Sequence, residues 1–405
     1  MSEIANGKWR ALLLIATAQL FVLTLWFSGT AVGPELAEAW NLDSTEEAWL
    51  TNAVQLGFVV GALLSAILTI ADVIPPRYLF SICALTGAAA TALIAVVVDS
   101  GITAILLRFI TGVMLAGVYP IGMKMMAAWF DKGRGLAIGV LVGALTVGSA
   151  SPHLIRGLSG IGNPDFVLYA TAGIAAFGGF LILLYEDGPY TPRSAPFDPS
   201  AISRIVTDRG VILANVGYFG HMWELYAVWT WIPLYLVMSF EASNVSNPDQ
   251  LAAFFAFGTI AIGGLGAWLG GSAADRWGRT TVTSISMIIS GASCIFAGLA
   301  FGLSPWIIGS FVLIWGIFII SDSAQFSAAI SELAEESYVG TALTLQTAIG
   351  FLITIFSIQL IPIVADIVGW QWAFVPLVVG PLIGTIAMLY LRILPEAERL
   401  AGGAR

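Results

Sequence analysis

The sequence predicts an all-α membrane protein in which twelve transmembrane helices form two pseudo-symmetric six-helix halves. Apolar runs of about 20 residues recur along the 405 residues, and each is long enough to cross roughly 30 Å of hydrocarbon as a helix. The composition agrees, with 58% hydrophobic and 10% charged residues. One polar segment near the middle divides the chain into two parts of similar length. These three observations place most of the chain in lipid.

The composition also argues against several other classes of protein. A soluble chain carries about 25% charged residues, and the mean hydropathy here is +0.90. Cys83 and Cys294 both lie inside apolar runs, which favours packing over a disulfide. With two histidines and no Cys/His cluster, we expect neither a metal site nor a cofactor. The net charge of −9 lies mostly in loops and indicates no nucleic-acid partner.

The apolar runs are grouped six and six around one solvated linker. Residues 187–209 are rich in Pro, Ser and charge, so we expect an N-terminal bundle over 1–186 and a C-terminal bundle over 210–405. The first run extends to about Val32 without a small-residue cleavage site after it, so it is not read as a cleaved signal. The predicted spans are 9–32, 46–70, 77–98, 102–129, 134–157, 165–185, 211–240, 249–273, 280–301, 305–328, 340–364 and 370–394.

The basic residues predict the orientation in the membrane. If both termini are cytoplasmic, all but two of the 16 basic residues, Arg108 and Arg156, fall on the cytoplasmic side. The acidic stretch Ser331–Ser337 departs from this pattern, but Asp and Glu contribute little to topology. We therefore expect a multi-pass protein of a bacterial inner membrane. The residues on the cytoplasmic side are Lys8, Arg10, Arg77, Lys124, Lys132, Arg134, Arg193, Arg204, Arg209, Arg276, Arg279, Arg392, Arg399 and Arg405.

The two halves read as an internal repeat. Asp72 follows the second span and Asp275 follows the eighth, an offset of 203 residues. Gly135 opens the fifth span and Gly340 opens the eleventh, an offset of 205 residues. A constant offset of half the chain predicts two bundles related by an axis along the membrane normal.

One loop carries the most specific motif. The string GGSAADRWGRT runs from Gly270 to Thr280 and resembles the loop motif G-x-x-x-D-R-x-G-R of the major facilitator superfamily. The first-half copy keeps Gly61, Asp72 and Arg77 at different spacing, so it is degenerate. RFITGVMLAG, from Arg108, resembles the family's R-x-x-x-G motif, and DKGRGLAIG, from Asp131, resembles its entry into the fifth span.

The loop motif has a physical interpretation as a cytoplasmic gate. Its glycines allow a close turn, and its aspartate can accept hydrogen bonds from a helix N-terminus or pair with an arginine. Such a latch would hold the cytoplasmic side shut. The simpler alternative is a loop whose arginines only anchor orientation. The predicted gating residues are Gly271, Asp275, Arg276, Gly278 and Arg279.

Ionisable residues inside apolar runs mark a candidate site, since a charge at the bilayer centre is costly. His221 and Glu224 lie one turn apart in the seventh span, and Asp322 lies in the tenth. Burial disfavours the charged form of such groups, so a buried carboxylate or imidazole can exchange a proton near neutral pH. We predict proton coupling at these three residues. The alternative is that they only satisfy one another or a neighbouring helix.

The resemblance implies that spans 1, 4, 7 and 10 line a central cavity. Arg108 in span 4 is predicted to hold an anionic group or to balance charge, while Lys124 is read equally well as snorkelling to the interface. His153 and Arg156 are read as an interface anchor or an outer gate. The predicted substrate-binding residues are Arg108, Gln325, Gln19, Trp26, Tyr119 and Tyr218.

The resemblance implies a secondary-active transporter that alternates access, with no enzymatic activity. From the buried acids and Arg108 we expect it to move a small polar or anionic organic solute together with protons. We expect a monomer in the lipid bilayer, since the fold needs no partner. A proton-driven exporter of drugs or lipophilic cations is the first alternative, although the span-5 string GVLVGALTVGSASPHLIRG, from Gly139, lacks the Gly-Pro pattern of such exporters. A membrane enzyme or receptor is the second, without a nucleophile–base set or a soluble domain to support it.

Overall fold

The computed structural model of the chain describes residues 2–97, 100–130, 134–159, 161–190, 198–335 and 337–404. The chain divides into two compact units, Met1–Ser194 and Ala195–Arg405, and the division falls inside the predicted linker. Several predicted features lie outside the described residues: the start of the Asp131–Gly139 string, with the side chain of Arg134 and the surroundings of Gly135, and the positions of Lys132, Arg193 and Arg405.

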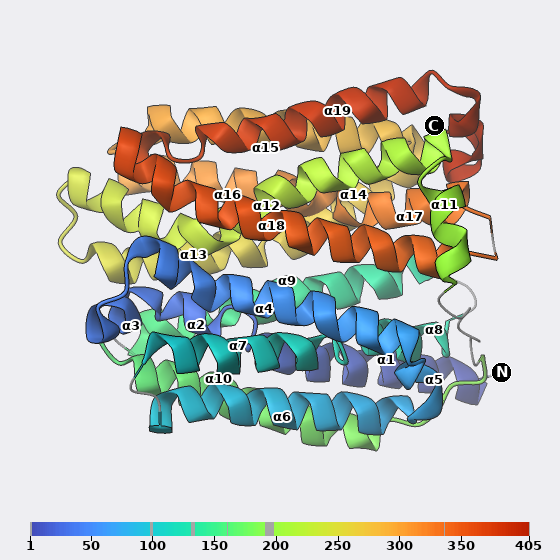
Figure 1. Cartoon of the computed structure of the whole chain (residues 1–405), viewed down its shortest axis with the longest axis horizontal. Helices are drawn as coiled ribbons and strands as arrows, with labels where there is room; N and C mark the ends of the chain where they lie inside the picture. Colours follow the sequence, from blue (N-terminus) through green and yellow to red (C-terminus); the bar gives the residue numbers. More distant parts are fainter. Residues whose placement is uncertain are drawn as a thin grey trace. The chain divides into compact units, whose positions relative to one another are not determined.

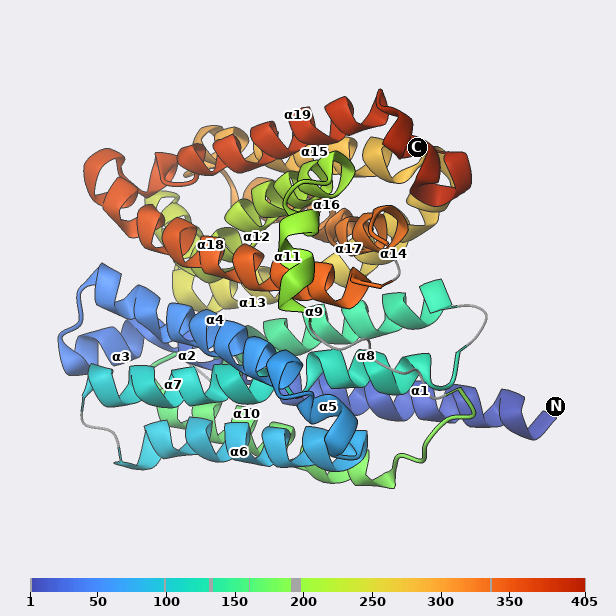
Figure 2. The same cartoon turned by 45° about the vertical axis from the view of Figure 1, so that its right-hand side comes forward.

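Unit 1 is built from helices alone among its described residues (Figure 1). Short segments interrupt or extend the long helices near their ends, as α5 does after α4 (Figure 2). The helices are α1 Ser2–Leu23, α2 Ser28–Ala31, α3 Gly33–Trp40, α4 Ser44–Ile67, α5 Ile70–Val73, α6 Pro76–Val97, α7 Gly101–Leu115, α8 Tyr119–Ala127, α9 Arg134–Ser159, α10 Pro164–Leu181 and the 3-10 helix η1 Ile182–Leu184.

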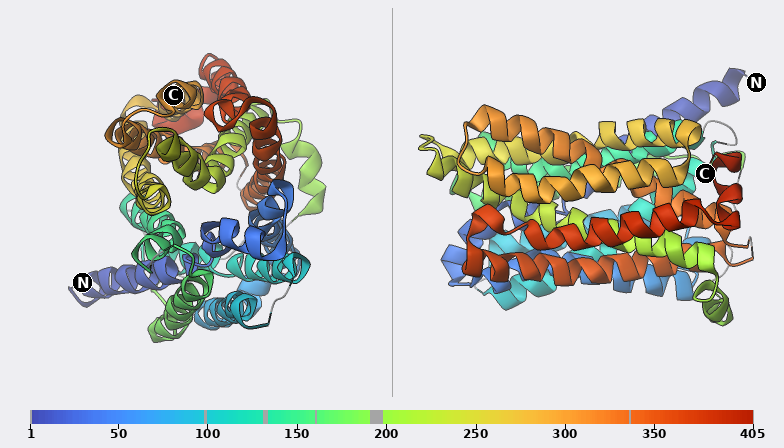
Figure 3. Two further views of the ribbon diagram at one scale, coloured as in Figure 1. Left: turned by 90° about the vertical axis from the view of Figure 1, so that its left-hand side faces the viewer. Right: turned by 90° about the horizontal axis from the view of Figure 1, so that it is seen from above.

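Unit 2 is also helical throughout its described part, and within each unit the long helices run roughly along one direction (Figure 3). The elements are η2 Pro199–Ala201, α11 Ile202–Ile205, α12 Arg209–Ala242, α13 Pro248–Ala261, α14 Gly263–Trp277, α15 Arg279–Ala300, α16 Pro305–Ser321, α17 Ser323–Leu333, α18 Val339–Val368, η3 Trp370–Trp372, η4 Val375–Val378, α19 Val379–Arg392 and η5 Pro395–Gly403, where η marks a 3-10 helix.

Eleven helices among the described residues are long and apolar enough to cross a membrane, against twelve predicted spans. They correspond to the second through twelfth predictions. The first prediction, residues 9–32, falls on α1 and α2, which a non-helical stretch separates. The eleven are Ser44–Ile67, Pro76–Val96, Gly101–Ala127, Ala137–Ser159, Pro164–Leu184, Arg209–Ala242, Pro248–Trp277, Arg279–Ala300, Pro305–Leu333, Val339–Val368 and Trp370–Arg392.

The sequence explains where many of these helices begin. Asp43 and Glu46 form a reciprocal capping box at α4, with backbone-to-carboxylate distances of 2.8 and 3.0 Å. Prolines occupy the first turn of α10, α13 and α16, where the missing N–H costs no helical hydrogen bond. These four helices therefore start at residues that can satisfy or dispense with the first backbone donors.

Several predicted spans are broken rather than continuous. The first breaks at Thr24–Phe27, the fourth at Ala116–Val118, the eighth at Ile262 and the tenth at Asp322. The backbone at the first two breaks makes bonds to the third residue back instead of the fourth, for example from Trp26 to Leu23. Pro120 lies just after the break in the fourth span, in the first turn of α8. These breaks place non-helical backbone at membrane depth, where protein must satisfy it.

Glycines bring pairs of helices into backbone contact in both units. A side chain at Gly61 on α4 would meet the backbone of Val113 on α7, and one at Gly112 on α7 would meet Val54. In unit 2 a side chain at Gly266 would meet Ile317, and one at Gly316 would meet Thr259. The offsets between equivalent glycines are 266 − 61 = 205 and 316 − 112 = 204 residues. The repeat expected from the loops is therefore also present in the helix packing.

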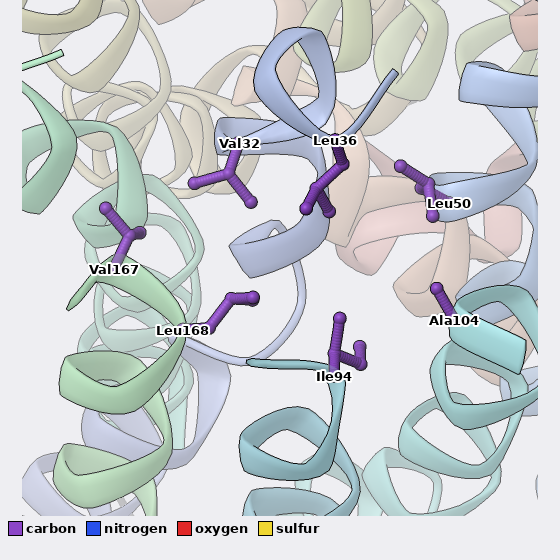
Figure 4. Packing of buried hydrophobic residues seen from close by; sticks show 7 residues of the cluster. All are labelled: Val32, Leu36, Leu50, Ile94, Ala104, Val167 and Leu168. Atoms are coloured by element: carbon purple, nitrogen blue, oxygen red, sulfur yellow. The ribbon is translucent and has the colours of Figure 1, made fainter. Parts of the chain in front are cut away.

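An apolar cluster holds α3 against the end of unit 1 (Figure 4). Val32 and Leu36 point from the segment before and within α3 toward side chains of four other helices. All seven members are buried, so α3 is packed rather than free. The other members are Leu50, Ile94, Ala104, Val167 and Leu168.

Candidate functional site

A fully enclosed carboxylate lies near the middle of α12. Glu224 is 1% exposed. One oxygen, Oε1, accepts from the indole N–H of Trp315 at 3.0 Å and from Cys294 Sγ at 3.3 Å, while Oε2 accepts from Ser290 Oγ at 2.8 Å. The three donors come from α15 and α16, so Glu224 links three transmembrane helices. Hydrogen bonds from three donors stabilise the carboxylate, and a proton on either oxygen would weaken the hydrogen bonds to that oxygen.

One turn earlier on α12, His221 faces Asp322 at the α16–α17 break. The Nδ1 of His221 lies 2.9 Å from Oδ1 of Asp322, and both side chains are 2% exposed. The approach lacks the geometry of a hydrogen bond, so Asp322 Oδ1 has no hydrogen-bond partner among the described residues. The Nε2 of His221 is likewise buried without a partner in the described chain. The pair therefore contains two buried polar atoms, Nε2 of His221 and Oδ1 of Asp322, that make no hydrogen bond in the described chain.

Aromatic rings surround the imidazole. Phe326 and Tyr218 lie 5.7 and 6.2 Å from the His221 ring, and 6.1 Å from each other. Tyr218 and Phe326 are buried, at 7% and 0% exposure. The pair thus lies in a low-dielectric setting, which strengthens its electrostatic response to one proton.

Arg108, predicted to bind substrate, lies fully buried between α1, α2 and α4. Its guanidinium donates to the carbonyls of Leu25, Trp26 and Leu50 and to the hydroxyl of Ser28, with three of the four distances between 2.8 and 3.0 Å. Arginine has five N–H donors, so four are engaged here. This geometry holds the break after α1, and the substrate-binding role stays a prediction.

The other predicted binding residues are dispersed. Gln19 donates to the carbonyl of Leu141 at 3.0 Å and leaves its own oxygen without a partner in the described part of the chain. Trp26 packs on Phe58 with ring centroids 5.1 Å apart. Tyr119 begins α8 beside the fourth-span break. In the described geometry these residues form no single group.

The predicted gating motif is tied to α17 through its last arginine. Arg279 donates to both carboxylate oxygens of Glu332, at 2.7 to 3.0 Å, and to Gln325 Oε1 at 2.7 Å. Gln325 is therefore engaged in the loop network rather than with His221. Asp275 is 74% exposed and 3.8 Å from Arg279, a weak contact. Gly278 has φ 88°, a left-handed turn that favours glycine.

The first-half copy makes a comparable link with the charges exchanged. Lys124 on α8 lies 2.5 Å from Asp72 and donates to the carbonyl of Ala71 at 2.7 Å. In unit 2 the loop supplies the cation, Arg279, and the helix supplies the acid, Glu332. In the degenerate copy, Asp72 in the loop thus still pairs with Lys124 near the end of the fourth span. Lys124 therefore has a protein partner and does not only snorkel to the membrane interface.

The end of unit 2 carries a further ion pair. Arg209, at the start of α12, donates to both oxygens of Glu396 in η5 at 2.9 to 3.1 Å. A backbone N–H, together with the hydrogen bonds and charge of Arg209, holds the pKa of Glu396 below its usual range. The same segment returns to Glu332, which accepts from the backbone of Ala401 at 2.9 Å.

Arg156, read as an anchor or gate, joins α9 to α3. Its guanidinium contacts Glu35 Oε1 at 2.8 and 2.9 Å, and the carboxylate of Glu47 lies against Gly33 at the start of α3. His153, one turn away, is fully buried, and neither ring nitrogen has a partner in the described chain. Asp165 lies in the first turn of α10.

The sequence analysis missed several polar residues. Ser290 and Cys294 hold Glu224, and only the structure brings α15 beside it. Asn52 and Gln55 are completely buried in α4, and all four amide atoms lack partners among the described residues. The sequence signal that could have identified Asn52 and Gln55 is the presence of two amides one helical turn apart in an apolar span. No group of three or more His, Cys, Asp or Glu side chains in the described chain could hold a metal.

The model of the major facilitator superfamily matches residues 14–357. The chain belongs to this superfamily. A Bacillus subtilis (strain 168) protein named as the niacin/nicotinamide transporter NiaP is 24% identical over 315 residues, which cover 72% of this chain and 74% of the relative. The family and this relative make the chain a multi-pass membrane transporter of small solutes.

Solved structures of superfamily transporters share the fold. The nucleoside transporter NupG has a TM-score of 0.72 at 15% identity, covering 95% of this chain and 99% of its own. The D-xylose-proton symporter has a TM-score of 0.72 at 14% identity, covering 96% and 98%. A bacterial homolog of the lysosomal transporter Spinster, in an inward-facing unoccupied state, gives 0.71 at 14% identity, covering 97% of both chains.

Proposed function

We propose that this superfamily transporter couples the movement of a small polar organic solute to protons through Glu224 and the His221–Asp322 pair. The observation that carries the proposal is the pair itself, which lies fully buried at a broken transmembrane helix with Nε2 and Oδ1 unoccupied by hydrogen bonds in the described chain. Membrane helices rarely bury ionisable groups without a functional reason.

Each group has a distinct part in the proposal. Protonation of the His221–Asp322 pair removes or creates one buried charge, and this changes the attraction that holds α12 to the α16–α17 break. Glu224 differs from the pair because three protein donors reach its carboxylate, Trp315 and Cys294 at Oε1 and Ser290 at Oε2. A proton on Oε2 would compete with the hydrogen bond from Ser290 and loosen α15 from α12. The two sites give the transporter two buried places at which a proton can be held.

The solute class is proposed from polarity and from the names of relatives. Those names refer to niacin or nicotinamide, nucleosides and D-xylose, which are all small polar molecules. No observation in the described residues favours the alternative of a lipophilic-cation exporter, since Glu224 is fully engaged by protein donors. Import by symport is the proposed direction.

Transport into liposomes tests this function. Purified protein is reconstituted, and uptake of labelled nicotinamide, nicotinate, uridine and D-xylose is measured with and without an inward proton gradient. We expect at least one probe to accumulate with the gradient and to leak out when a protonophore is added. Asp322→Asn and Glu224→Gln should lose about tenfold or more of the gradient-driven uptake yet keep solute exchange, which needs no net proton movement.

The matched control is Glu241→Gln, which neutralises an exposed carboxylate near the end of the same helix and should leave uptake unchanged. Uptake that ignores the protonophore, or full gradient-driven uptake in both variants, would contradict proton coupling at these residues. Failure of every probe to exchange would contradict the solute class.

A further inference from the structure

Two buried amides in α4 have no function in the site described above. Asn52 and Gln55 are 0% exposed, and the oxygen and nitrogen of each side chain lack a hydrogen-bond partner among the described residues. Their neighbour Thr51 is engaged, with its hydroxyl 2.6 Å from that of Thr30. The two residues are one helical turn apart, and together they bury four polar atoms without partners. This is unusual in a membrane span, where bulk water does not reach the backbone or side chains.

The amides lie on the side of α4 that turns away from its main neighbour. Gly57 and Gly61 mark the face that touches α7, because a side chain at either would meet the α7 backbone. At 100° per residue, Asn52 and Gln55 are about 120° to 180° from those glycines and about 60° from each other. Both amides therefore point in nearly the same direction, away from the tightly packed contact.

Burying an amide without a hydrogen-bond partner costs free energy on folding. A water or ligand that forms the missing hydrogen bonds therefore stabilises the folded protein. An amide offers one acceptor and two donors. Two amides on one face therefore match a group that presents a donor beside an acceptor, such as a carboxamide, the edge of a pyrimidine base or a sugar diol.

The charges of unit 1 favour an uncharged ligand. The four basic side chains described in α6 to α9 are all engaged by protein oxygens, so none of them is left to neutralise a carboxylate beside the amides. Arg77 donates to Tyr185, Arg108 to three carbonyls and Ser28, Lys124 to Asp72 and Ala71, and Arg156 to Glu35.

We propose that Asn52 and Gln55 bind the transported solute, and that the group they bind is uncharged and carries a hydrogen-bond donor beside an acceptor. The inference rests on the proposed transport function and narrows its solute class from small polar molecules to uncharged ones.

Binding to the purified full-length protein tests the ligand class. Nicotinamide and nicotinate form a matched pair that differ only in carboxamide against carboxylate, and uridine and D-xylose supply the other two uncharged edges. We expect an uncharged probe to bind at least tenfold more tightly than nicotinate, about 1.4 kcal/mol. Asn52→Leu and Gln55→Met should each weaken that binding at least tenfold. Tighter binding of nicotinate would overturn the inference.

Stability without ligand provides a second readout that a merely structural role would not give. Replacing an unpartnered buried amide by an apolar side chain of similar volume removes a desolvation cost, so both variants should raise the Tm of the empty protein by about 2 °C or more. Thr51→Val is the control on the same helix. It breaks a made hydrogen bond and should lower the Tm while the probe affinity stays at the wild-type value.

The outcomes separate this inference from the transport proposal. If wild-type protein transports a probe and both variants bind it normally, the amides hold only internal water, and the inference fails while the transport proposal stands. A lower Tm in the empty variants would also overturn it. If wild-type protein neither binds nor exchanges any probe, the transport proposal fails, and this inference fails with it.

Discussion

Arg108 holds broken backbone in place deep in unit 1. Helix α1 ends at Leu23. The guanidinium of Arg108 donates to the carbonyls of Leu25 and Trp26 and to the hydroxyl of Ser28, which follow that end. Carbonyls at such a break have no water to bind inside a membrane, so a planar group with several donors is well suited to satisfy them. The guanidinium of Arg108 therefore serves to satisfy the broken backbone of unit 1.

Arg108→Gln is expected to destabilise the protein by about 3 kcal/mol, because the shorter amide cannot reach all four oxygens and leaves buried carbonyls unpaired. Arg108→Lys should rescue little, since an ammonium lacks the planar fork. The Tm of the purified protein and probe affinity are measured together, with the exposed Arg204→Gln as control. Unchanged Tm with lost affinity for a carboxylate would instead support the predicted anion-binding role.

At the scale of elements, glycine contacts decide which helices can touch. The α4–α7 contact in unit 1 and the α14–α16 contact in unit 2 both bring backbones together at glycines. Small residues at such contacts allow dispersion and weak hydrogen bonds to replace the hydrophobic effect, which lipid does not provide between helices. The helix breaks at Ala116 and Asp322 lie beside these glycine contacts. The contacts therefore help to position the candidate sites.

Gly112→Ala should destabilise the protein by about 1–3 kcal/mol, because the added methyl group would meet the backbone of Val54 and force α4 and α7 apart. Gly143→Ala is the matched control, as an added methyl group there has nothing within 4 Å. Alanine is also the better helix former, so that control should be neutral or slightly stabilising. Chemical or thermal unfolding of both variants measures the difference, and equal stability would contradict the close packing.

At the scale of the whole molecule, the two units repeat one construction. Each couples its loop motif to the end of a broken helix by an ion pair, Asp72–Lys124 in unit 1 and Arg279–Glu332 in unit 2. The acid lies in the loop and the base in the helix in unit 1, and the reverse holds in unit 2. Both arrangements give an ion pair between loop and helix, although the loop sequences differ. The charge bias of the loops predicts that both of these links lie on the cytoplasmic side.

Cysteine labelling in bacterial cells tests the predicted orientation. Ser246→Cys and Ser203→Cys introduce thiols at exposed positions on loops predicted to lie on opposite sides of the membrane. The native Cys83 and Cys294 are buried and give a low background. A membrane-impermeant maleimide should label Ser246→Cys in intact cells and Ser203→Cys only in inverted vesicles. The reverse pattern would contradict the cytoplasmic termini.

Local sequence patterns were informative where local physics decides the outcome. Long apolar runs predicted eleven membrane helices that the structure identifies, because lipid forces each run to satisfy its own backbone. The Gly270–Thr280 string led to the superfamily, which the match over residues 14–357 shows. The count of twelve spans and the two six-helix bundles stay predictions.

The sequence by itself determined the class of the protein and the buried charges worth examining, since membrane insertion and motif spacing are properties of short segments. Only the tertiary structure decided their partners: Ser290 and Trp315 for Glu224, Asp322 for His221, and backbone carbonyls for Arg108. Those contacts join residues 58 to 101 positions apart. Contacts over such separations depend on helix packing, which no local pattern encodes.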